Sequence, residues 1–166
     1  MNVGVAHPPI VKTLHWPDEA GTQAFAAALA QCPALHHAFI ELHGDLGAGK
    51  TTLVRHILRS LGVAGRVKSP TYAVVEPYEL PELNVWHFDF YRFSDPREWE
   101  DAGFRDIFAS PGLKLAEWPE KAVGFLPPAD LVISLEALDD DLRQVTLAAQ
   151  TPTGVALLQA TSPAPL

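Results

Sequence analysis

The spacing of apolar residues predicts a helix, a strand and a second helix in the first third of the chain. Residues 17–32 start with Pro-Asp-Glu, which is typical of a helix N-terminus, and they continue as an alanine-rich stretch that Pro33 ends. Residues 38–43 form a short apolar run that predicts a strand. Leucine and isoleucine then form one stripe of a predicted helix over residues 51–61, and Gly62 ends it.

The middle of the chain predicts two paired strands and a further helix. The strands are expected over residues 72–80 and 83–90, and the short turn between them contains Pro81. So short a connection favours an antiparallel pair, because parallel neighbours need a long crossover. The helix is expected over residues 95–102, which begin with Asp-Pro.

The last third predicts short strands and completes the fold class. Apolar runs indicate strands over residues 113–118 and 131–135. Residues 142–149 alternate between polar and apolar, and Thr-Pro-Thr-Gly at 151–154 precedes another apolar run, which indicates a hairpin. Together with the sequence Gly-Asp-Leu-Gly-Ala-Gly-Lys-Thr at residues 44–51, which matches the phosphate-binding motif of P-loop proteins, these elements predict an α/β fold of the P-loop NTPase kind. Its mixed sheet is expected to have antiparallel edge strands and flanking helices.

The composition predicts one soluble domain that spans residues 1–166 and has loose termini at about 1–14 and 161–166. Apolar residues make up 48% of the chain, which is enough for a packed core. We find no targeting segment at the N-terminus, no glycine at position 2 for myristoylation and no apolar stretch long enough to span a bilayer. We therefore expect a cytoplasmic protein with no membrane association.

Residues 44–51 match the phosphate-binding motif G-x-x-x-x-G-K-[ST] between the predicted strand and helix. Glycines let the backbone N–H groups of such a loop turn inward toward phosphate oxygens, and the following helix directs its N-terminal dipole at the same anion. The motif predicts that Lys50 reaches the β- and γ-phosphates and that the Thr51 hydroxyl binds Mg²⁺. The predicted loop contacts are Gly44, Asp45, Leu46, Gly47, Ala48, Gly49, Lys50 and Thr51.

Two acidic residues end predicted core strands and are candidates for catalysis and for the metal. Asp89 follows the apolar run 85–88, and Glu117 follows the run 113–116. P-loop enzymes place an acid at such a strand end, where it holds Mg²⁺ directly or through water, or orients the attacking water. A helix cap or a surface ion pair is the structural alternative for each.

Thr71 and Trp118 are weaker candidates. Ser-Pro-Thr at residues 69–71 follows the P-loop helix, and switch loops of nucleotide hydrolases carry a threonine that closes on Mg²⁺ and the γ-phosphate. An ordinary turn explains the same three residues. Trp118 follows Glu117 and is placed to stack near the nucleotide, whereas a core or surface aromatic is an equally good interpretation.

Charge and residue types exclude several classes of ligand. The net charge of −8 argues against direct binding of DNA or other bulk nucleic acid, which requires clustered basic residues. Cys32 is the only cysteine, which excludes an internal disulfide and a multi-cysteine zinc site. Asparagine occurs only at positions 2 and 84, so no Asn-Lys-x-Asp motif for guanine exists, and ATP is the expected nucleotide.

Four motifs in this order and spacing resemble the bacterial TsaE family, formerly called YjeE. They are Gly-Asp-Leu-Gly-Ala-Gly-Lys-Thr-Thr at 44–52, Lys-Ser-Pro-Thr-Tyr at 68–72, His-Phe-Asp-Phe-Tyr-Arg at 87–92 and Glu-Trp-Pro-Glu at 117–120. The resemblance covers about residues 15–150. Phe90 departs from the leucine that is commoner in the third motif, and Pro119 falls at a variable position.

The resemblance implies a P-loop ATPase that is weak alone and acts with the TsaB and TsaD proteins. That assembly places a threonylcarbamoyl group on the adenosine next to the anticodon of tRNA, so this chain would meet tRNA only through the complex. By motif match, Thr52 and Trp118 join the nucleotide contacts, and Thr71 belongs to the switch loop. Thr51, Glu117 and Asp89 are the implied Mg²⁺ contacts, and Glu117 is the better direct ligand.

Two other functions use the same loop. A small-molecule kinase would need a basic lid over the phosphates, and Arg92, Arg97 and Arg105 are candidates for it, although acidic residues are interleaved with them. A regulatory module that binds ATP without hydrolysing it would release no phosphate even in the presence of partners.

Overall fold

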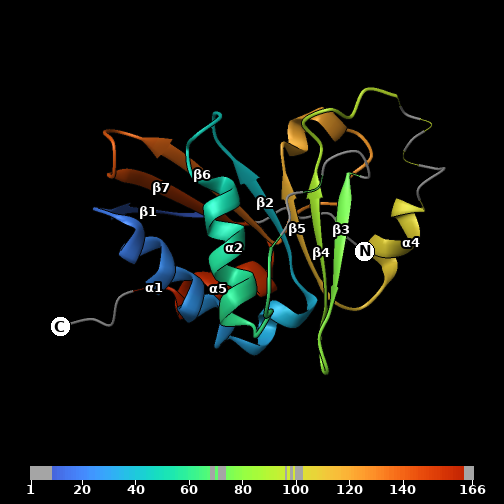
Figure 1. Ribbon diagram of the computed structural model, residues 1–166, viewed down its shortest axis with the longest axis horizontal. Coiled ribbons are helices and arrows are strands. Elements are labelled where there is room, and N and C mark those ends of the chain that lie inside the picture. Colours follow the sequence, from blue (N-terminus) through green and yellow to red (C-terminus); the bar gives the residue numbers. More distant parts are fainter. Residues whose placement is uncertain are drawn as a thin grey trace, which may run out of the picture.

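A seven-stranded sheet with helices on both faces forms the body of the protein in a computed structural model, which describes residues 9–67, 70, 74–95, 97, 99 and 103–162 (Figure 1). The strands are β1 (Ile10–Trp16), β2 (Phe39–His43), β3 (Val75–Glu79), β4 (Asn84–Asp89), β5 (Leu113–Glu117), β6 (Leu131–Ala137) and β7 (Arg143–Ala149). The helices are α1 (Glu19–Ala30), α2 (Lys50–Ser60), α4 (Phe104–Ala109) and α5 (Pro152–Ala160), with the 3-10 segments η1 (Pro33–His37) and η2 (Pro119–Ala122).

The sheet is parallel at its centre and antiparallel at its edges. Its strand order is β1-β7-β6-β2-β5-β4-β3. The central strand β2 runs parallel to β5 and β6, and β4 runs parallel to β5. The pairs β1–β7, β6–β7 and β3–β4 are antiparallel. This arrangement confirms the predicted α/β class and its mixed sheet, including the antiparallel pair β3–β4.

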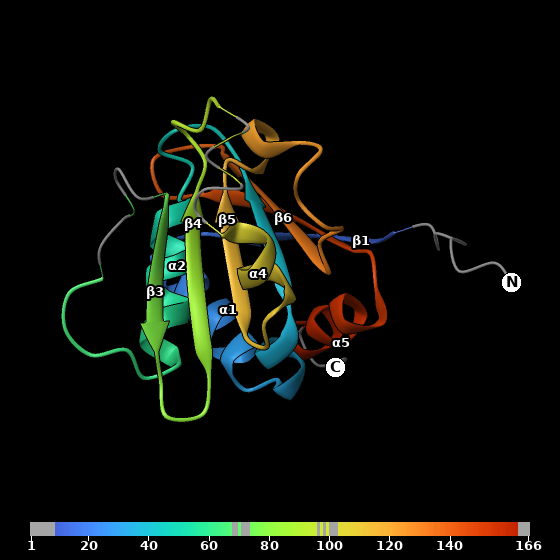
Figure 2. The same ribbon diagram turned by 90° about the vertical axis from the view of Figure 1, so that its right-hand side faces the viewer.

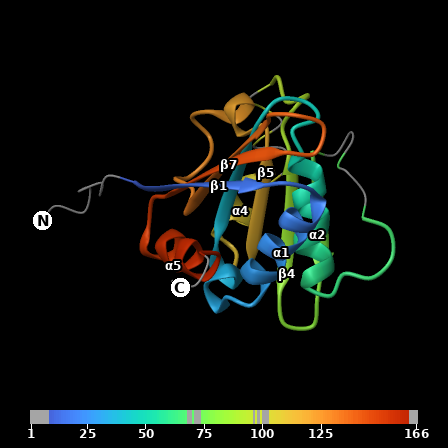
Figure 3. The same cartoon turned by 90° about the vertical axis from the view of Figure 1, so that its left-hand side faces the viewer.

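Alternation along the strands divides the core between the two faces of the sheet. Ile40 and Leu42 of β2 pack into an aliphatic cluster with the helices α1, α2 and α5, whereas Phe39 joins an aromatic cluster with Phe88 and Phe104. Figures 2 and 3 show α1, α2 and α5 on one face of the sheet and α4 on the other. A strand that exposes neither face to water carries apolar residues on both, which explains the unbroken apolar runs of the parallel strands.

Most predicted elements are confirmed with small shifts of their ends. The helix expected over residues 17–32 is α1, which Asp18 caps by accepting a hydrogen bond from the backbone N–H of Ala20 at 3.0 Å. The helix expected over 51–61 is α2. The helix expected over 95–102 falls mostly outside the described residues, and α4 is a helix that the sequence analysis did not predict.

The predicted hairpin around residues 151–154 is wrong. These residues begin α5, in which Thr151 accepts a hydrogen bond from the backbone N–H of Gly154 at 3.1 Å, and Pro152 occupies the first turn. A Cβ atom at position 154 would lie 1.8 Å from the carbonyl oxygen of Asp130, so the glycine serves close packing rather than a turn. The hairpin of this region is formed by β6 and β7.

The predicted loose N-terminal segment is also wrong for residues 10–14. They belong to β1, which pairs along its whole length with β7. One face of this edge strand, with Val11, Thr13 and His15, is exposed. On the other face burial increases from the half-exposed Ile10 to the buried Trp16, so the apolar pattern of the strand is weak. In the described part of the chain, no helix has the length and apolar character needed to cross a membrane.

Asp130 joins three segments of the chain just before β6. Its carboxylate accepts hydrogen bonds from the backbone N–H of Phe39 at 2.7 Å and from the hydroxyl of Thr151 at 2.7 Å. Its backbone N–H donates to the carbonyl of Phe39 at 2.8 Å, and its carbonyl accepts from Gln150 at 3.0 Å. The start of β2, the end of β7 and the cap of α5 therefore meet at this one residue.

Candidate functional site

The segment between β2 and α2 forms the tight loop that the phosphate-binding motif predicts. Gly44 has a φ of 147°, and a Cβ atom there would lie 2.7 Å from the carbonyl oxygen of Leu135. Gly49, directly before α2, has a φ of 108° in the left-handed region. Other residues are strained or excluded at these positions. The loop therefore brings the backbone N–H groups of the α2 N-terminus to the carboxyl end of β2.

A cavity of about 280 Å³ opens between this loop and the carboxyl ends of β4 and β5. Its lining residues are Leu46, Gly47, Gly49, Lys50, Thr51, Thr52, Asp89, Tyr91, Glu117, Trp118 and Arg143. The cavity thus brings together most of the residues that the sequence analysis predicts as nucleotide and metal contacts. Gly44, Asp45 and Ala48 belong to the loop without lining this cavity, and Thr71 lies outside the described residues.

The two strand-end acids lie side by side because their strands are parallel neighbours. Asp89 is the last residue of β4, Glu117 is the last residue of β5, and the two are partners in the strand register. Both positions follow apolar runs, as the sequence predicts. The edge of the sheet nearest the loop therefore carries two carboxylates next to the first turn of α2.

Glu117 is held by a hydrogen bond at each oxygen. The residue is only 2% exposed. Oε1 accepts from the hydroxyl of Thr51 at 2.8 Å, and Oε2 lies 2.6 Å from Nε2 of the buried His87. These bonds connect the end of β5 to Thr51 at the start of α2 and to His87 within β4.

Asp89 is half-buried and has a different environment. Its Oδ1 accepts a hydrogen bond from the backbone N–H of Tyr91 at 3.0 Å, so it also stabilises the turn after β4. Burial raises the pKa of the Asp89 carboxyl above its ordinary value, and the nearby Glu117 carboxylate adds to the rise. The Tyr91 hydrogen bond opposes this shift. A carboxyl with a raised pKa in a cavity is a candidate for proton transfer.

Lys50 lies between the loop and an aromatic side chain. Its ammonium donates to the carbonyl oxygen of Gly44 and lies 3.4 Å from the centre of the Trp118 ring. Burial lowers the pKa of the Lys50 ammonium, and carboxylates led by Glu117 oppose that shift. Trp118 therefore lies beside Lys50, and the centre of its ring is 4.9 Å from the centre of the Tyr91 ring.

Three residues of this region were not predicted as site residues. His87 and Tyr91 belong to the motif at 87–92, so their position next to Asp89 was a usable signal. Arg143 comes from β7 and donates from Nε to the carbonyl oxygen of Ala48 at 2.9 Å. A second nitrogen donates to the carbonyls of Asp139 and Asp140, both at 3.1 Å. No local pattern marks Arg143, because its role depends on a contact between distant segments.

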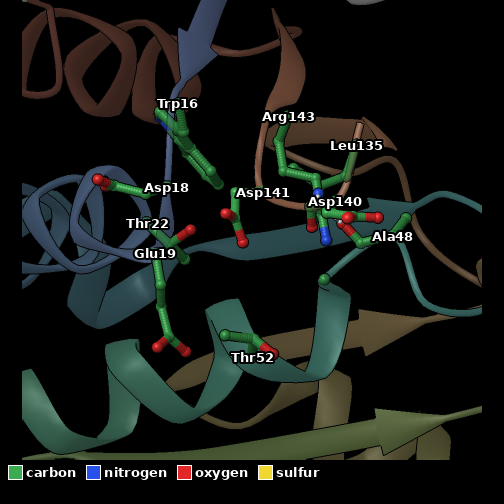
Figure 4. A pocket seen from close by; sticks show the side chains of 11 residues that line it. Trp16, Asp18, Glu19, Thr22, Ala48, Thr52, Leu135, Asp140, Asp141 and Arg143 are labelled. Carbon is green, nitrogen blue, oxygen red and sulfur yellow. Dashed lines mark hydrogen bonds between the residues drawn. The ribbon is translucent and has the colours of Figure 1, made fainter. Parts of the chain in front are cut away.

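A second hollow of about 240 Å³ lies on the other side of the loop (Figure 4). Figure 4 shows that its walls come from the N-terminal end of α1, from Thr52 of α2 and from the β6–β7 hairpin. Its lining residues are Trp16, Asp18, Glu19, Thr22, Ala48, Gly49, Thr52, Leu135, Asp140, Asp141 and Arg143. Gly49, Thr52 and Arg143 line both the cavity and this hollow, so the two are neighbours across the loop.

Comparison with known proteins gives consistent matches over most of the chain. The family model described as "Threonylcarbamoyl adenosine biosynthesis protein TsaE" matches residues 16–145. The tRNA threonylcarbamoyladenosine biosynthesis protein TsaE of Haemophilus influenzae is 42% identical over 154 residues, which cover 90% of this chain and 97% of that protein. The Bacillus subtilis protein of the same name is 37% identical over 110 residues, or 66% of this chain and 68% of that protein.

The fold matches a solved structure of similar length. The crystal structure of Bacillus subtilis YdiB superposes with a TM-score of 0.77 and 26% sequence identity, and the match covers 94% of this chain and 97% of that one. Together with the family model and the close sequence relatives, this match confirms the resemblance inferred from the four motifs. The chain therefore belongs to the TsaE family of threonylcarbamoyl adenosine biosynthesis proteins.

Proposed function

We propose that this protein binds ATP with Mg²⁺ at the loop of residues 44–51 and hydrolyses ATP in support of tRNA threonylcarbamoyladenosine formation. The observation that carries the proposal is the pair of Thr51 and Glu117, whose side-chain oxygens lie 2.8 Å apart at the start of α2. A hydroxyl at the head of the P-loop helix beside a strand-end acid is the arrangement that P-loop hydrolases use for Mg²⁺.

The loop and Lys50 supply the phosphate site of this proposal. Backbone N–H groups at the start of α2 donate to phosphate oxygens, and the helix dipole favours their negative charge. Lys50 adds a point charge, and its contact with the Gly44 carbonyl places the ammonium over the loop that would surround the phosphates. The ring of Trp118 shields this ammonium from water on one side.

The oxygen donors at the sheet edge fit Mg²⁺. Thr51, Glu117 and Asp89 offer one hydroxyl and two carboxylates, which are the hard ligands that this ion prefers alongside water and phosphate. When bound, Mg²⁺ would neutralise charge that develops on the transferred phosphoryl group. We assign Glu117 to hold the ion with Thr51, and we assign Asp89 to orient and deprotonate the attacking water because its pKa is raised.

The second hollow suits the nucleoside half of ATP. It adjoins the loop at Gly49 and Thr52 and is lined by carboxylates of α1 and of the β6–β7 hairpin. Carboxylates accept hydrogen bonds from ribose hydroxyls and from the exocyclic amine of adenine. The buried Trp16 forms an apolar wall of the same hollow. With no Asn-Lys-x-Asp motif in the sequence, ATP is the nucleotide that we propose.

We propose TsaB and TsaD as the partners, on the basis of the family resemblance. The net charge of −8 disfavours direct capture of tRNA, so the chain would meet tRNA through the complex. Thr71, outside the described residues, stays the predicted switch-loop residue that couples the nucleotide to the partners. The free thiol of Cys32 agrees with the reducing cytoplasm, which is the compartment that we propose.

The kinase alternative is disfavoured by the positions of its candidate lid residues. Arg97 is exposed and pairs with Asp95 at 3.0 Å, and Arg105 lies on α4 on the opposite face of the sheet from α2. Arg143 is the single arginine among the described residues that line the cavity. None of the three candidate lid residues, Arg92, Arg97 and Arg105, lines it.

Calorimetric titration with ATP and Mg²⁺ tests the binding site. Lys50→Ala removes an ammonium whose hydrogen bonds to phosphate are worth about 1.5–3 kcal/mol each, so affinity should fall about tenfold or more. Arg59→Ala, which removes an exposed charge on the same helix, is the matched control and should bind normally. Equal affinity in Lys50→Ala and the wild type would refute the assigned site.

Phosphate release measured with and without TsaB, TsaD and tRNA tests the activity. We expect slow release by the chain alone, stimulation by the partners and loss of that stimulation in Thr71→Ala. No release under any of these conditions would favour the non-hydrolysing regulatory module. Transfer of phosphate from ATP to a small molecule would favour the kinase.

A further inference from the structure

His87 is a buried titratable side chain that the proposed mechanism does not use. It is fully buried on β4, where the surrounding core is largely apolar. Its Nε2 lies 2.6 Å from Oε2 of Glu117. Its Nδ1 has no hydrogen-bond partner among the described residues. The bond to Glu117 is therefore the single hydrogen bond found for this imidazole in the described structure.

The polarity of this hydrogen bond follows from the carboxylate. An ionised carboxylate only accepts, so His87 donates from Nε2, and Nδ1 is left as the unpaired atom. A buried polar atom without a partner destabilises the fold, whereas an apolar side chain at this position would carry no such cost. The contribution of His87 that offsets this cost is the hydrogen bond to Glu117.

The two hydrogen bonds on Glu117 together fix the orientation of its carboxylate. His87 holds Oε2 from the interior of the sheet, and Thr51 holds Oε1 at the start of α2. Without the imidazole, the carboxylate would be free to rotate about its last side-chain bond and to turn Oε1 away from the helix. Two further histidine–glutamate pairs among the described residues, His43–Glu41 and His56–Glu19, are partly exposed at the surface and fix no strand-end acid.

We propose that His87 is a positioning residue, which acts through Glu117 to keep Oε1 directed at the Mg²⁺ site beside Thr51. Partners that hydrogen-bond metal-ligating groups commonly control metal affinity in this way. The inference rests on the proposed function, since it needs a nucleotide-bound Mg²⁺ next to Thr51. It adds a role for a side chain that does not contact the nucleotide.

The test uses two substitutions at position 87 and nucleotide binding as the readout. His87→Leu removes the donor and fills a similar volume. His87→Gln keeps an N–H donor near the place of Nε2. His56→Leu and His56→Gln are matched controls, because His56 forms a histidine–glutamate pair 3.4 Å long that does not involve Glu117. The affinity for ATP is measured by calorimetry in EDTA and again in Mg²⁺, and thermal unfolding is followed for every variant.

The proposal expects a loss that depends on the metal. In EDTA, all variants should bind ATP like the wild type, because the loop and Lys50 are unchanged. In Mg²⁺, His87→Leu should lose about tenfold in affinity, in line with substitutions around metal ligands, and His87→Gln should recover most of it. The Mg²⁺ concentration for half-maximal ATP hydrolysis should rise in His87→Leu in parallel.

Two results would overturn the proposal in different ways. If Mg²⁺ tightens ATP binding equally in the wild type and in His87→Leu, His87 has no positioning role, and the proposed function stands. The same conclusion follows if His87→Leu and His87→Gln weaken binding equally with and without Mg²⁺. If Mg²⁺ has no effect on ATP binding by the wild type, the proposed function fails, and the role of His87 fails with it. Should His87→Leu not fold, the comparison of His87→Asn with His87→Gln decides, because the shorter amide does not reach Glu117.

Discussion

The two hollows on either side of the loop of residues 44–51 are built in different ways. The cavity beside Lys50 is walled by the ends of the parallel strands β4 and β5, which carry Asp89 and Glu117. The hollow beside Trp16 is walled by α1 and by the antiparallel β6–β7 hairpin. The first concentrates its polar groups at two register-matched strand ends, whereas the second gathers them from turns and a helix start.

This difference suits the cavity to catalysis and the hollow to ligand binding. Acids at the ends of rigid strands hold their positions to within small tolerances, as catalysis requires. Exposed carboxylates on turns, such as Asp140 and Asp141, can adjust to a ligand but hold it less firmly. We therefore expect substitutions in the cavity to change the rate of hydrolysis, and substitutions in the hollow to change affinity by smaller factors.

Glu117→Gln should have the largest effect. It keeps the shape of the side chain and removes the charge that we propose to hold Mg²⁺ with Thr51, so partner-stimulated phosphate release should fall about 100-fold or more. Secondary structure, followed by circular dichroism, should not change. The matched control is Glu120→Gln, which alters an exposed acid three residues away. Full activity of Glu117→Gln would show that this buried acid is structural, and the contrast between the two hollows would be lost.

Arg143→Ala should have the next largest effect, because Arg143 lines both the cavity and the hollow. Loss of its hydrogen bond to the Ala48 carbonyl removes a support of the loop, and ATP affinity should fall roughly tenfold. Arg143→Lys should recover less than half of the lost binding free energy, since a lysine does not span the carbonyls of both the loop and the hairpin. The affinity of both variants for ATP is measured by calorimetry. Unchanged affinity in Arg143→Ala would show that the β6–β7 hairpin does not support ATP binding.

Asp141→Asn should weaken ATP binding roughly threefold, which corresponds to a neutral hydrogen bond replacing a charge-assisted one. Asp139→Asn changes the same turn without altering the lining of the hollow, so it is the control. The sign of the change in affinity distinguishes two roles for the Asp141 carboxylate. Tighter binding in Asp141→Asn would mean that the carboxylate repels phosphates rather than accepting hydrogen bonds from the nucleoside.

Asp89→Asn should slightly stabilise the protein at neutral pH, although it should lower the rate of ATP hydrolysis. Because the pKa of Asp89 is raised in the folded state, the native protein binds its proton more tightly than the unfolded chain. The resulting stabilisation is present at low pH and is lost as the pH rises from the ordinary value of 3.8 through the raised folded value. At pH 7, Asp89→Asn should therefore raise the free energy of unfolding, and this advantage should vanish below about pH 4.

Urea unfolding at a series of pH values measures this effect. Asp95→Asn is the control, because a hydrogen bond from Arg97 lowers the pKa of that exposed carboxyl, and its replacement should not stabilise the protein at neutral pH. A loss of stability in Asp89→Asn at pH 7 would show that the hydrogen bond to Tyr91 outweighs the cost of burial.

The loop of residues 44–51 and the acids near it could be predicted because each of their sequence patterns lies within a short segment of the chain. The glycine motif, the strand before it and the acids after two apolar runs each lie within a few residues, and the structure places them around one cavity. β1 was missed because its exposed face blurs the apolar pattern. Thr-Pro-Thr-Gly at 151–154 was misassigned because threonine, proline and glycine favour both turns and helix starts. Arg143 was missed because its partner, Ala48, is 95 positions away.

The connections made by Asp130 bear on when the protein can finish folding during its synthesis. The N-terminal end of the central strand β2 obtains its side-chain acceptor from a residue 91 positions later in the chain. The same carboxylate accepts a hydrogen bond from the hydroxyl of Thr151, which caps α5 and lies 21 positions further on. A ribosome releasing this chain from the N-terminus would therefore expose an incomplete β2 until Asp130 and Thr151 have emerged. Asp130→Ala should slow the last phase of refolding, and it should leave the sheet edge that carries Asp89 and Glu117 intact.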